Sequence, residues 1–504
     1  MKKSTKFLIS LLALVILPGC FAFAKSKLID KVTERVMNTF NVPGVAVAVV
    51  KDGKIVHMKG YGVSSLAGKA SVDEHTLFAI ASNSKAFTGA ALSILVREKK
   101  LRWDTKVCDI IPEFRLYDPY VTQNFTISDL LSHRGGYGLG SGDLMIWPDG
   151  SDFNTKDVIY NLRFLKGESP FRTKYSYNNL MYIVAGEVVS RVSGISWEEF
   201  VESRIMSPLG MTRSAASYAR LKDKNNVIDP HVSVNGRVQV VEMKLNPMAN
   251  PAGGIYSSVS DMSKWIIAQM EKREYEDTWT PQTIIPVRGP AAYKVNFSAY
   301  ALGWRVNDIE GFRMVTHTGG LSGVLTQVTM IPDLKLGIIV FTNQQSSEAF
   351  SSITNTILDS YLGIEGRDRV SENFERFQRA TNEARKIVNE VEKVVEGAKG
   401  GLSNEELKKY CGTFKDSWLG EVRIDLSGER LRFTSARSPK LSGEMFFYKG
   451  NTFIVKWDDR SFDADAFAVY TLDREGVADS FTMRAISPLT DFSYDFHDLL
   501  FKRQ

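Results

Sequence analysis

Apolar residues recur along this chain with two different periods, which predict a mixture of helices and strands. Spacings of three and four residues predict helices over 28–40, 181–192 and 197–205, and in a stretch that begins at Ser260. Runs rich in β-branched residues predict strands over 45–50, 55–58, 313–318, 324–331 and 336–342. Asp52-Gly53 separates the first two strands and favours a tight hairpin turn. We therefore expect an α/β (α+β) domain in which the first hairpin and the late strands complete one antiparallel sheet.

The pattern changes near residue 367. From Arg367 to Glu396 apolar residues recur at spacings of about three and four between dense charges, which predicts a long helix. This helix is either an oligomerising coiled coil or a connection docked on a neighbouring domain, and its few heptads favour the connection. After Ser403 short strands alternate with turns, a pattern typical of a small β-barrel or sandwich. The chain thus divides into a leader (1–24), a main domain (27–362), a charged helical linker (363–403) and a β domain (404–504).

The leader has the pattern of an export signal. Met1-Lys2-Lys3 precedes an apolar run from Phe7 to Leu17, which is too short for a transmembrane helix but suits a signal peptide. Cleavage after Ala24 is one expectation. The other is lipidation at Cys20, because Leu17-Pro18-Gly19-Cys20 is similar to a bacterial lipobox. We expect a periplasmic or secreted protein whose contact with a membrane is limited to that anchor.

Charge, cysteine content and histidine spacing limit the kinds of partner, crosslink and metal site that we expect. The 504 residues include 63 Lys and Arg against 58 Asp and Glu; without the three leader lysines the balance is 60 against 58, too even to indicate a nucleic-acid partner. Cys108 and Cys411 fall in different predicted domains, so no disulfide framework is implied. The six histidines are scattered without metal-ligand spacing. We expect neither a metal nor a cofactor.

A serine and a lysine three residues apart open one further predicted helix. Residues three apart share a helix face, so the amine of Lys85 can lie beside the hydroxyl of Ser82. A serine hydroxyl is a weak nucleophile and needs such a neighbouring base. The apolar face of this helix consists of Phe87, Ala90, Ala91, Ile94 and Leu95. Ser-x-x-Lys alone has little specificity, because a chain of this length contains on the order of one by chance.

Two further stretches offer groups that an activated serine needs. Tyr177 and Asn179 place a phenol and an amide two residues apart, just before a predicted helix. His317-Thr318-Gly319-Gly320 lies on a strand, and its glycines would let a substrate backbone approach closely. Together with Ser-x-x-Lys, these stretches resemble the three motifs of the serine β-lactamase and penicillin-binding-protein superfamily.

The resemblance is closest to the class C β-lactamase-related hydrolases, which include D-aminopeptidases, DD-peptidases and esterases. It covers about residues 27–362, and further segments similar to the family follow in the expected order: 130–133, 208–211, 252–254 and 302–304. The resemblance implies a sheet flanked by helices with an all-helical subdomain. The last hundred residues resemble the small lipocalin-like β-barrel appended to some members, on the segments Tyr410-Cys411-Gly412 and Asp491-Phe492-Ser493-Tyr494.

The resemblance also implies a role for each residue. Ser82 attacks a carbonyl and forms an acyl-enzyme. Lys85, or Tyr177 activated by Lys85, takes the proton, although both have ordinary pKa values near 10 that must fall for this work. Asn179 holds Lys85 or the substrate amide. The backbone amides of Ser82 and Gly320 form the oxyanion hole, which is often the largest catalytic contribution.

Some positions leave an alternative or depart from the family. Tyr175 is the alternative phenol, although counting back from Gly186 favours Tyr177, and His133 is expected to be structural. His317 stands where β-lactamases usually carry lysine, so at neutral pH the fixed positive charge is mostly absent. β-Lactams and D-alanyl-D-alanine termini present a carboxylate to this position. We therefore expect weakened carboxylate recognition by the substrate-binding residues His317, Thr318, Gly319 and Gly320.

These observations predict an exported serine hydrolase acting on a small-molecule or peptide substrate, a D-amino-acid peptide or ester. A true β-lactamase or DD-carboxypeptidase is one alternative. A non-catalytic binding or regulatory module of the same fold is another, and the presence of Ser82, Lys85 and Tyr177 argues against it. The oligomeric state stays open.

Overall fold

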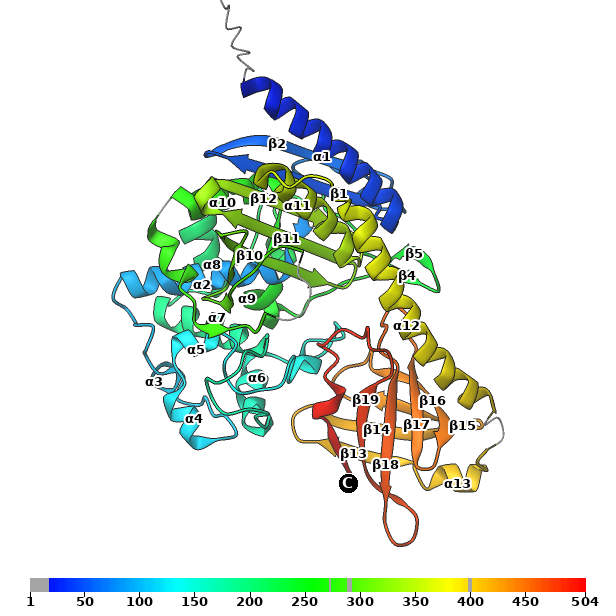
Figure 1. Cartoon of the computed structure of the whole chain (residues 1–504). Coiled ribbons are helices and arrows are strands. Elements are labelled where there is room, and N and C mark those ends of the chain that lie inside the picture. The colour runs from blue at the N-terminus through cyan, green and yellow to red at the C-terminus, as the bar shows by residue number, and fades with distance from the viewer. Residues whose placement is uncertain (1–17, 272, 288–291, 398–400) are drawn as a thin grey trace, which may run out of the picture.

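A sheet of eight antiparallel strands organises the N-terminal part of the chain (Figure 1). The computed structural model describes residues 18–504 except 272, 288–291 and 398–400. The strand order is β2-β1-β12-β11-β10-β9-β8-β7, so the first hairpin lies beside the late strands, as predicted. The strands are β1 (Gly44–Lys51), β2 (Lys54–Gly62), β7 (Thr283–Ile284), β8 (Ser298–Tyr300), β9 (Arg305–Ile309), β10 (Phe312–Leu321), β11 (Val324–Ile331) and β12 (Leu336–Thr342).

Helices cover both faces of this sheet, which explains the unbroken apolar run of β1. Successive residues of a strand point to opposite faces. Val45, Val47 and Val49 share a core with α1 (Pro18–Phe40) and α11 (Ser347–Leu362). The alternate residues from Ala46 to Val50 share the second core, which includes α10 (Val259–Glu271).

The start of α1 differs from the sequence expectation. The predicted helix begins at Leu28, whereas α1 begins at Pro18 and so includes the last residues of the predicted leader. Residues 1–17, which hold most of the predicted export signal, lie outside the described residues. None of the described helices is both long and apolar enough to span a membrane.

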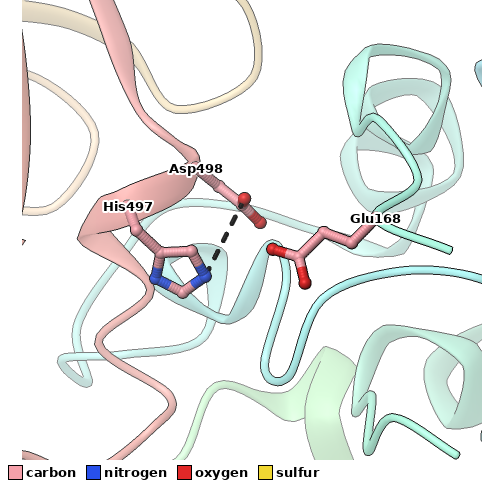
Figure 2. A group of neighbouring side chains, drawn as sticks. All are labelled: Glu168, His497 and Asp498. Carbon is pink, nitrogen blue, oxygen red and sulfur yellow. Dashed lines mark ion pairs between the residues drawn. The ribbon is translucent and has the colours of Figure 1, made fainter.

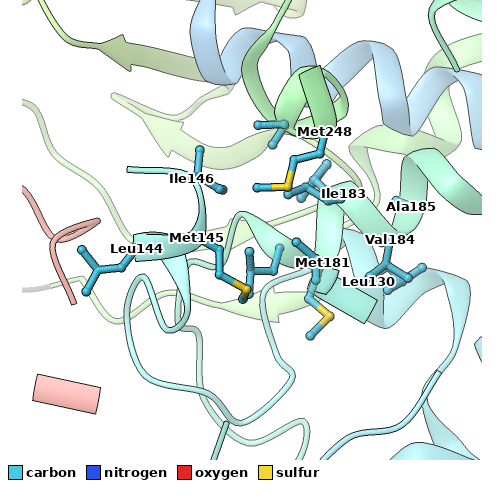
Figure 3. Packing of buried hydrophobic residues seen from close by; sticks show 14 of the residues in the cluster. Leu130, Leu144, Met145, Ile146, Met181, Ile183, Val184, Ala185 and Met248 are labelled. Carbon is cyan, nitrogen blue, oxygen red and sulfur yellow. The ribbon is translucent and has the colours of Figure 1, made fainter. Parts of the chain in front are cut away.

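A helical subdomain lies between the early and late strands of the sheet. Its helices are α2 (Ser84–Arg97), α3 (Val107–Ile110), α4 (Pro119–Asn124), α5 (Ile127–Leu131), α6 (Thr155–Asn161), α7 (Leu180–Ser193), α8 (Trp197–Val201) and α9 (Asn250–Gly253). Two small pairs of strands accompany them: β3 (Phe78–Ala79) with β6 (Tyr256–Ser257), and β4 (His231–Val234) with β5 (Arg237–Val240). Leu144, Met145 and Ile146 are buried in its core, near Met181 and Ile183 of α7 (Figure 3). This packing fixes the 3₁₀ turn Asp143–Met145 against α7.

The helix α12 (Arg369–Gly397) runs from the sheet domain to the C-terminal domain (Figure 1). Near its start the ring of Phe374 packs edge-on against Phe40 of α1, with 5.7 Å between centroids. Near its end Val391 is buried with Ile454 and Ile486 of the C-terminal domain. The apolar stripe is therefore used within the chain, which agrees with a docked connection.

The C-terminal domain is a closed barrel of eight strands, preceded by α13 (Asn404–Lys408). The strands are β13 (Gly412–Asp416), β14 (Gly420–Ser427), β15 (Arg430–Ser435), β16 (Ser442–Lys449), β17 (Thr452–Trp457), β18 (Ala466–Leu472), β19 (Ala478–Ala485) and β20 (Leu500–Arg503). The predicted class is confirmed: an α/β domain with an antiparallel sheet flanked by helices, followed by a small barrel.

Candidate active site

Ser82 lies in a short turn between β3 and α2. The sequence pattern predicts Ser82 in the first turn of the helix, whereas in the structure it lies in the 3₁₀ turn Ala81–Asn83 just before α2. We call these three residues the serine turn. Ala81 has a φ of +51°, which is uncommon for a residue with a side chain. Such backbone conformations persist where the surroundings enforce them, and they concentrate at functional sites.

Lys85 is fully buried, and its amine makes three hydrogen bonds. Its Nζ donates to Ser82 Oγ at 3.1 Å, to Asn179 Oδ1 at 2.7 Å and to the carbonyl oxygen of Ala252 at 2.8 Å. Burial lowers the pKa of Lys85 from 10.5 to about 7, and the carboxyl group of Asp143 opposes part of this shift. A lysine in this state exchanges its proton near neutral pH.

Tyr177 lies on another side of Ser82. Its ring centroid is 4.9 Å from Lys85 Nζ, and its phenol is near enough to the Ser82 side chain for Ser82 to influence its pKa. Burial raises the pKa of Tyr177 above its ordinary value, while the neighbouring Ser82 side chain works against that rise. The other phenol, Tyr175, instead accepts a hydrogen bond of 3.0 Å from Arg305. The structure therefore brings Tyr177, not Tyr175, to the serine.

His317 is buried and uncharged at neutral pH. Its Nδ1 lies 2.6 Å from the carbonyl oxygen of Thr318, which can only accept, so Nδ1 carries the proton. Its Nε2 lies 2.8 Å from the hydroxyl of Tyr300, which must then donate. Burial lowers the pKa of His317 to about 3, with smaller contributions from the charges of Lys85 and Arg305. The sequence expectation that this position lacks a positive charge agrees with the geometry.

The edge of β10 runs directly beside the serine turn. β9 pairs with β10 only from Phe312 to Thr316, so the segment from His317 onward extends beyond β9. A Cβ on Gly319 would lie 2.2 Å from the carbonyl oxygen of Ile80, so only glycine permits this approach. Thr318 and Gly320 alternate with it on the exposed side of the strand.

Three residues of the site were missed from the sequence: Asp143, Tyr300 and Arg305. Asp143 is fully buried and accepts a hydrogen bond of 2.7 Å from Asn179 Nδ2. Burial raises the pKa of Asp143 from 3.8 to about 7. Arg305 lies opposite Thr316 in the β9–β10 pair. No motif marks these residues, because their roles come from neighbours in other segments.

His133 has the structural role that the sequence suggested. Its Nδ1 accepts a hydrogen bond of 3.1 Å from the backbone amide of Asn178, and its ring packs against Tyr177 with 4.2 Å between centroids. Burial keeps the pKa of His133 well below its ordinary value, so the ring is neutral. It therefore supports the segment that carries Tyr177 and Asn179.

One group of described side chains has metal-ligand types. Glu168, His497 and Asp498 have ligand atoms within 4.8 Å of one another, and His497 forms an ion pair with Asp498 (Figure 2). Glu168 and His497 are exposed, and exposed acidic groups often gather without a metal. Glu168 belongs to the sheet domain and His497 and Asp498 belong to the C-terminal domain, so this group lies where the two domains meet.

Comparisons with known proteins identify the family to which the sheet domain belongs. The profile of the beta-lactamase family matches residues 29–361, and a domain of unknown function (DUF3471) matches residues 397–503. Unguisins hydrolase ungD of Aspergillus violaceofuscus is 32% identical over 66% of this chain, and the match spans 64% of that relative's length. Unguisins hydrolase ungD' of Aspergillus campestris is 30% identical over 70% of this chain and 69% of its own. Protein flp of Staphylococcus aureus is 26% identical over 63% of each chain.

Solved structures share the fold. An octameric penicillin-binding protein homologue from Pyrococcus abyssi matches with a TM-score of 0.59 and 18% identity, over 94% of this chain and 99% of that chain. A class C beta-lactamase matches with a TM-score of 0.57 and 20% identity, over 68% of this chain and 97% of that chain. The family profile covers most of the sheet domain and includes the serine turn, Tyr177 and His317. The chain therefore belongs to the beta-lactamase family.

Proposed function

We propose that this chain is an exported serine hydrolase that forms an acyl-enzyme at Ser82 from a small amide or ester, with a D-amino-acid peptide or ester as its substrate class. One observation carries the proposal. The Ser82 hydroxyl lies 3.1 Å from a buried amine with a pKa of about 7, beside a strand edge on which His317 is neutral.

Lys85 is the better proton acceptor of the two candidates. Near pH 7 a large fraction of its amine is neutral, whereas burial keeps the Tyr177 phenol protonated. Ser82 Oγ bonds to the substrate carbonyl carbon, and its proton passes to Lys85 Nζ. The proton then goes to the leaving amine or alcohol as the carbon–nitrogen or carbon–oxygen bond breaks, and Tyr177 is placed to relay it. Water releases the acyl group by the reverse sequence.

The neutral His317 supports the substrate class. A substrate carboxylate at this position would lose its own hydration without gaining a charged partner, which is costly in a buried site. A β-lactamase or DD-carboxypeptidase remains the alternative, and Arg305 favours it, because its charge acts on His317 from the neighbouring strand. A binding module is disfavoured, because Ser82 and Lys85 are in contact and the relatives include named hydrolases.

A substrate panel on the processed enzyme tests the proposal. It contains D-amino acid amides with their L counterparts, p-nitrophenyl esters, nitrocefin and a peptide that ends in D-Ala-D-Ala. We expect the D-amides or esters to be turned over with a higher kcat/KM than nitrocefin and the D-Ala-D-Ala peptide. Hydrolysis of nitrocefin at a rate that approaches the diffusion limit would refute the substrate class, and loss of that activity in Arg305→Gln would identify the carboxylate partner.

Labelling by a fluorophosphonate probe tests the nucleophile. Ser82→Ala should abolish the labelling. Ser84→Ala is the matched control, because Ser84 is a buried serine two residues away whose hydroxyl only accepts a bond from the amide of Ile255. Labelling that persists in Ser82→Ala excludes the assigned nucleophile, and an unreactive wild-type protein favours the binding module.

Export has a separate test. Mass spectrometry of the protein from cells that express the full chain should find Lys25 as the first residue, or a lipid-modified Cys20. An intact Met1 in a cytosolic fraction would contradict export.

A further inference from the structure

The loop between β19 and β20 of the barrel reaches the active site of the sheet domain. In Figure 1 the C-terminal segment of the barrel lies alongside the helical subdomain. The ring of Phe492 packs edge-on against Tyr177, with 5.7 Å between centroids. Gly140, whose backbone amide binds the carbonyl oxygen of Tyr177, has a φ of +73°, and a Cβ there would lie 2.5 Å from the carbonyl oxygen of Phe492. The two domains therefore meet backbone to backbone beside the catalytic tyrosine.

The same loop holds the turn that carries Asp143. The carboxyl group of Asp495 accepts hydrogen bonds from the backbone amides of Gly142 at 2.5 Å and Leu144 at 3.2 Å, on either side of Asp143. The hydroxyl of Ser493 donates to Asp143 Oδ2 at 2.9 Å. Ser493, Asp495 and Asp143 are all buried, so these bonds are shielded from water. The barrel thus anchors both the backbone and the side chain at this position.

Asp143 in turn sets the orientation of Asn179. The amide nitrogen of Asn179 donates to Asp143 Oδ2, which leaves its oxygen to face Lys85 Nζ. The reverse orientation would place two donors against each other at Lys85. A chain of contacts therefore runs from Ser493 through Asp143 and Asn179 to Lys85.

The packing inside the barrel also indicates that the loop between β19 and β20 is the part of the barrel that acts on the site. Aromatic side chains fill the interior, with ring centroids as close as 4.6 Å between Phe481 and Phe501 and 5.1 Å between Phe414 and Phe481. An eight-stranded barrel is just wide enough for side chains to fill it. Because side chains occupy the interior, we expect the barrel to act on the site through the loop between β19 and β20.

We propose that Ser493, supplied by the barrel, is a positioning residue for catalysis: through Asp143 and Asn179 it holds the amine of Lys85 at Ser82. This inference rests on the proposed Ser82 chemistry. It makes the barrel a part of the active site, and it makes Phe492 a wall of the site beside Tyr177.

The relay has an electrostatic consequence that packing alone would not produce. The hydrogen bond from Ser493 lowers the pKa of Asp143 and so favours its carboxylate, whose charge raises the pKa of Lys85. Removing the hydroxyl should therefore leave Asp143 more often neutral and Lys85 more easily deprotonated. Other groups face this pair from neighbouring elements: His133, His317, Tyr177, Asp491 and Asp495. The two histidines and the tyrosine stay neutral at neutral pH, because burial shifts their pKa values away from it.

The experiment measures the rate of fluorophosphonate labelling against pH from 5 to 9.5. In wild type we expect the labelling rate to rise with pH as Lys85 loses its proton, with a midpoint near pH 7. We call this rising part of the profile the acid limb and give its position by its midpoint. Asp143→Asn keeps an acceptor for Asn179 but removes the charge, and should move the limb down by roughly one pH unit. Ser493→Ala should move it down by roughly half a unit, and Ser493→Thr, which keeps the hydroxyl, should restore it.

Arg437→Ala is the matched control for a loosened interface. Arg437 of the barrel pairs with Asp152 at 2.7 Å and with Asp157 at 2.9 Å on the sheet domain, without contact to the relay. The acid limb of the Arg437→Ala variant should stay at the wild-type position. A limb that stays in place or moves up in Ser493→Ala overturns the proposal, and so does an equal downward shift in Arg437→Ala. If Ser493→Ala labels too slowly to measure, the limb of Asp143→Asn decides by the same criterion.

This result is separable from the proposed function. Failure of wild type to label, or labelling that survives Ser82→Ala, refutes the serine chemistry itself. Ser82-dependent labelling with an unmoved limb in the Ser493 and Asp143 variants refutes only the positioning role.

Discussion

Replacing Lys85 by methionine tests whether burial has made this amine a base at neutral pH. Methionine keeps an unbranched apolar chain and removes only the titrating group. Unfolded, Lys85 has an ordinary pKa of 10.5; folded, burial holds it at about 7. Between these values the unfolded state binds a proton that the folded state does not, so stability rises with pH. The wild type should gain this stability above pH 7, and the variant should not.

The size of the effect follows from the shift. From pH 7 to pH 9.5 the wild type should gain about 3 kcal/mol over the variant, at about 1.4 kcal/mol per pH unit. The variant also loses the hydrogen bonds to Asn179 and Ala252. This loss lowers its stability by the same amount at both pH values, so it does not affect the change in stability with pH. Asp143 adds to the difference, because its pKa of about 7 rises further once Lys85 is gone, and the variant then loses stability over part of this range.

Urea unfolding at fixed ionic strength, from pH 7 to pH 9.5, measures the difference. Tryptophan fluorescence reports the unfolding, and Trp265 and Trp304, both buried in the sheet domain, contribute to this signal. A difference between wild type and Lys85→Met that stays constant over this range would refute the reasoning. Lys85 would then keep an ordinary pKa and could not act as a neutral base.

Three further substitutions test other parts of the structure. Tyr177→Phe should lower the kcat of Ser82-dependent ester hydrolysis by about 10²-fold without a change in melting temperature, because it removes only the proton relay; wild-type kcat would exclude that role. Gly140→Ala should cost about 1–3 kcal/mol of stability in urea unfolding, because of its φ of +73° and the 2.5 Å approach to the backbone of Phe492; a neutral effect would argue against that approach. Arg369→Met should cost about 3–5 kcal/mol, because it leaves the buried Asp359, now bonded to Arg369 at 2.6 Å, without its charged partner; adding Asp359→Leu should recover most of the loss.

Much of the fold follows from local patterns. The bounds predicted for β11 and β12 match the structure, because the turn that begins with Pro332 ends the first β-rich run and precedes the second. The hairpin turn at Asp52-Gly53 also follows from the sequence, since both residues take positive φ. The start of α1 does not, because its first residues share the composition of the leader.

Some features of the candidate site can also be predicted from the sequence. Ser82 and Lys85 lie three residues apart, so helical geometry alone predicts that their side chains meet, and the motif at Tyr177 and Asn179 adds the neighbouring groups. The missing charge at His317 can also be expected from its residue type. These features depend on short spacings and on intrinsic chemistry, which a sequence carries directly.

The burial of side chains and the contacts between distant segments cannot be predicted from local sequence patterns. Only the folded chain buries Lys85 away from water and lowers its pKa to about 7, and only the folded chain lowers that of His317 to about 3. Ser493 lies 350 positions from Asp143 along the chain, and their contact depends on how the barrel rests on the helical subdomain. Desolvation and contacts between domains are set by the packing of the whole molecule, so no local pattern records them. The motifs of the sequence identify the residue types of the site. The protonation states of these residues, and the contacts by which the barrel positions them, depend on the tertiary structure.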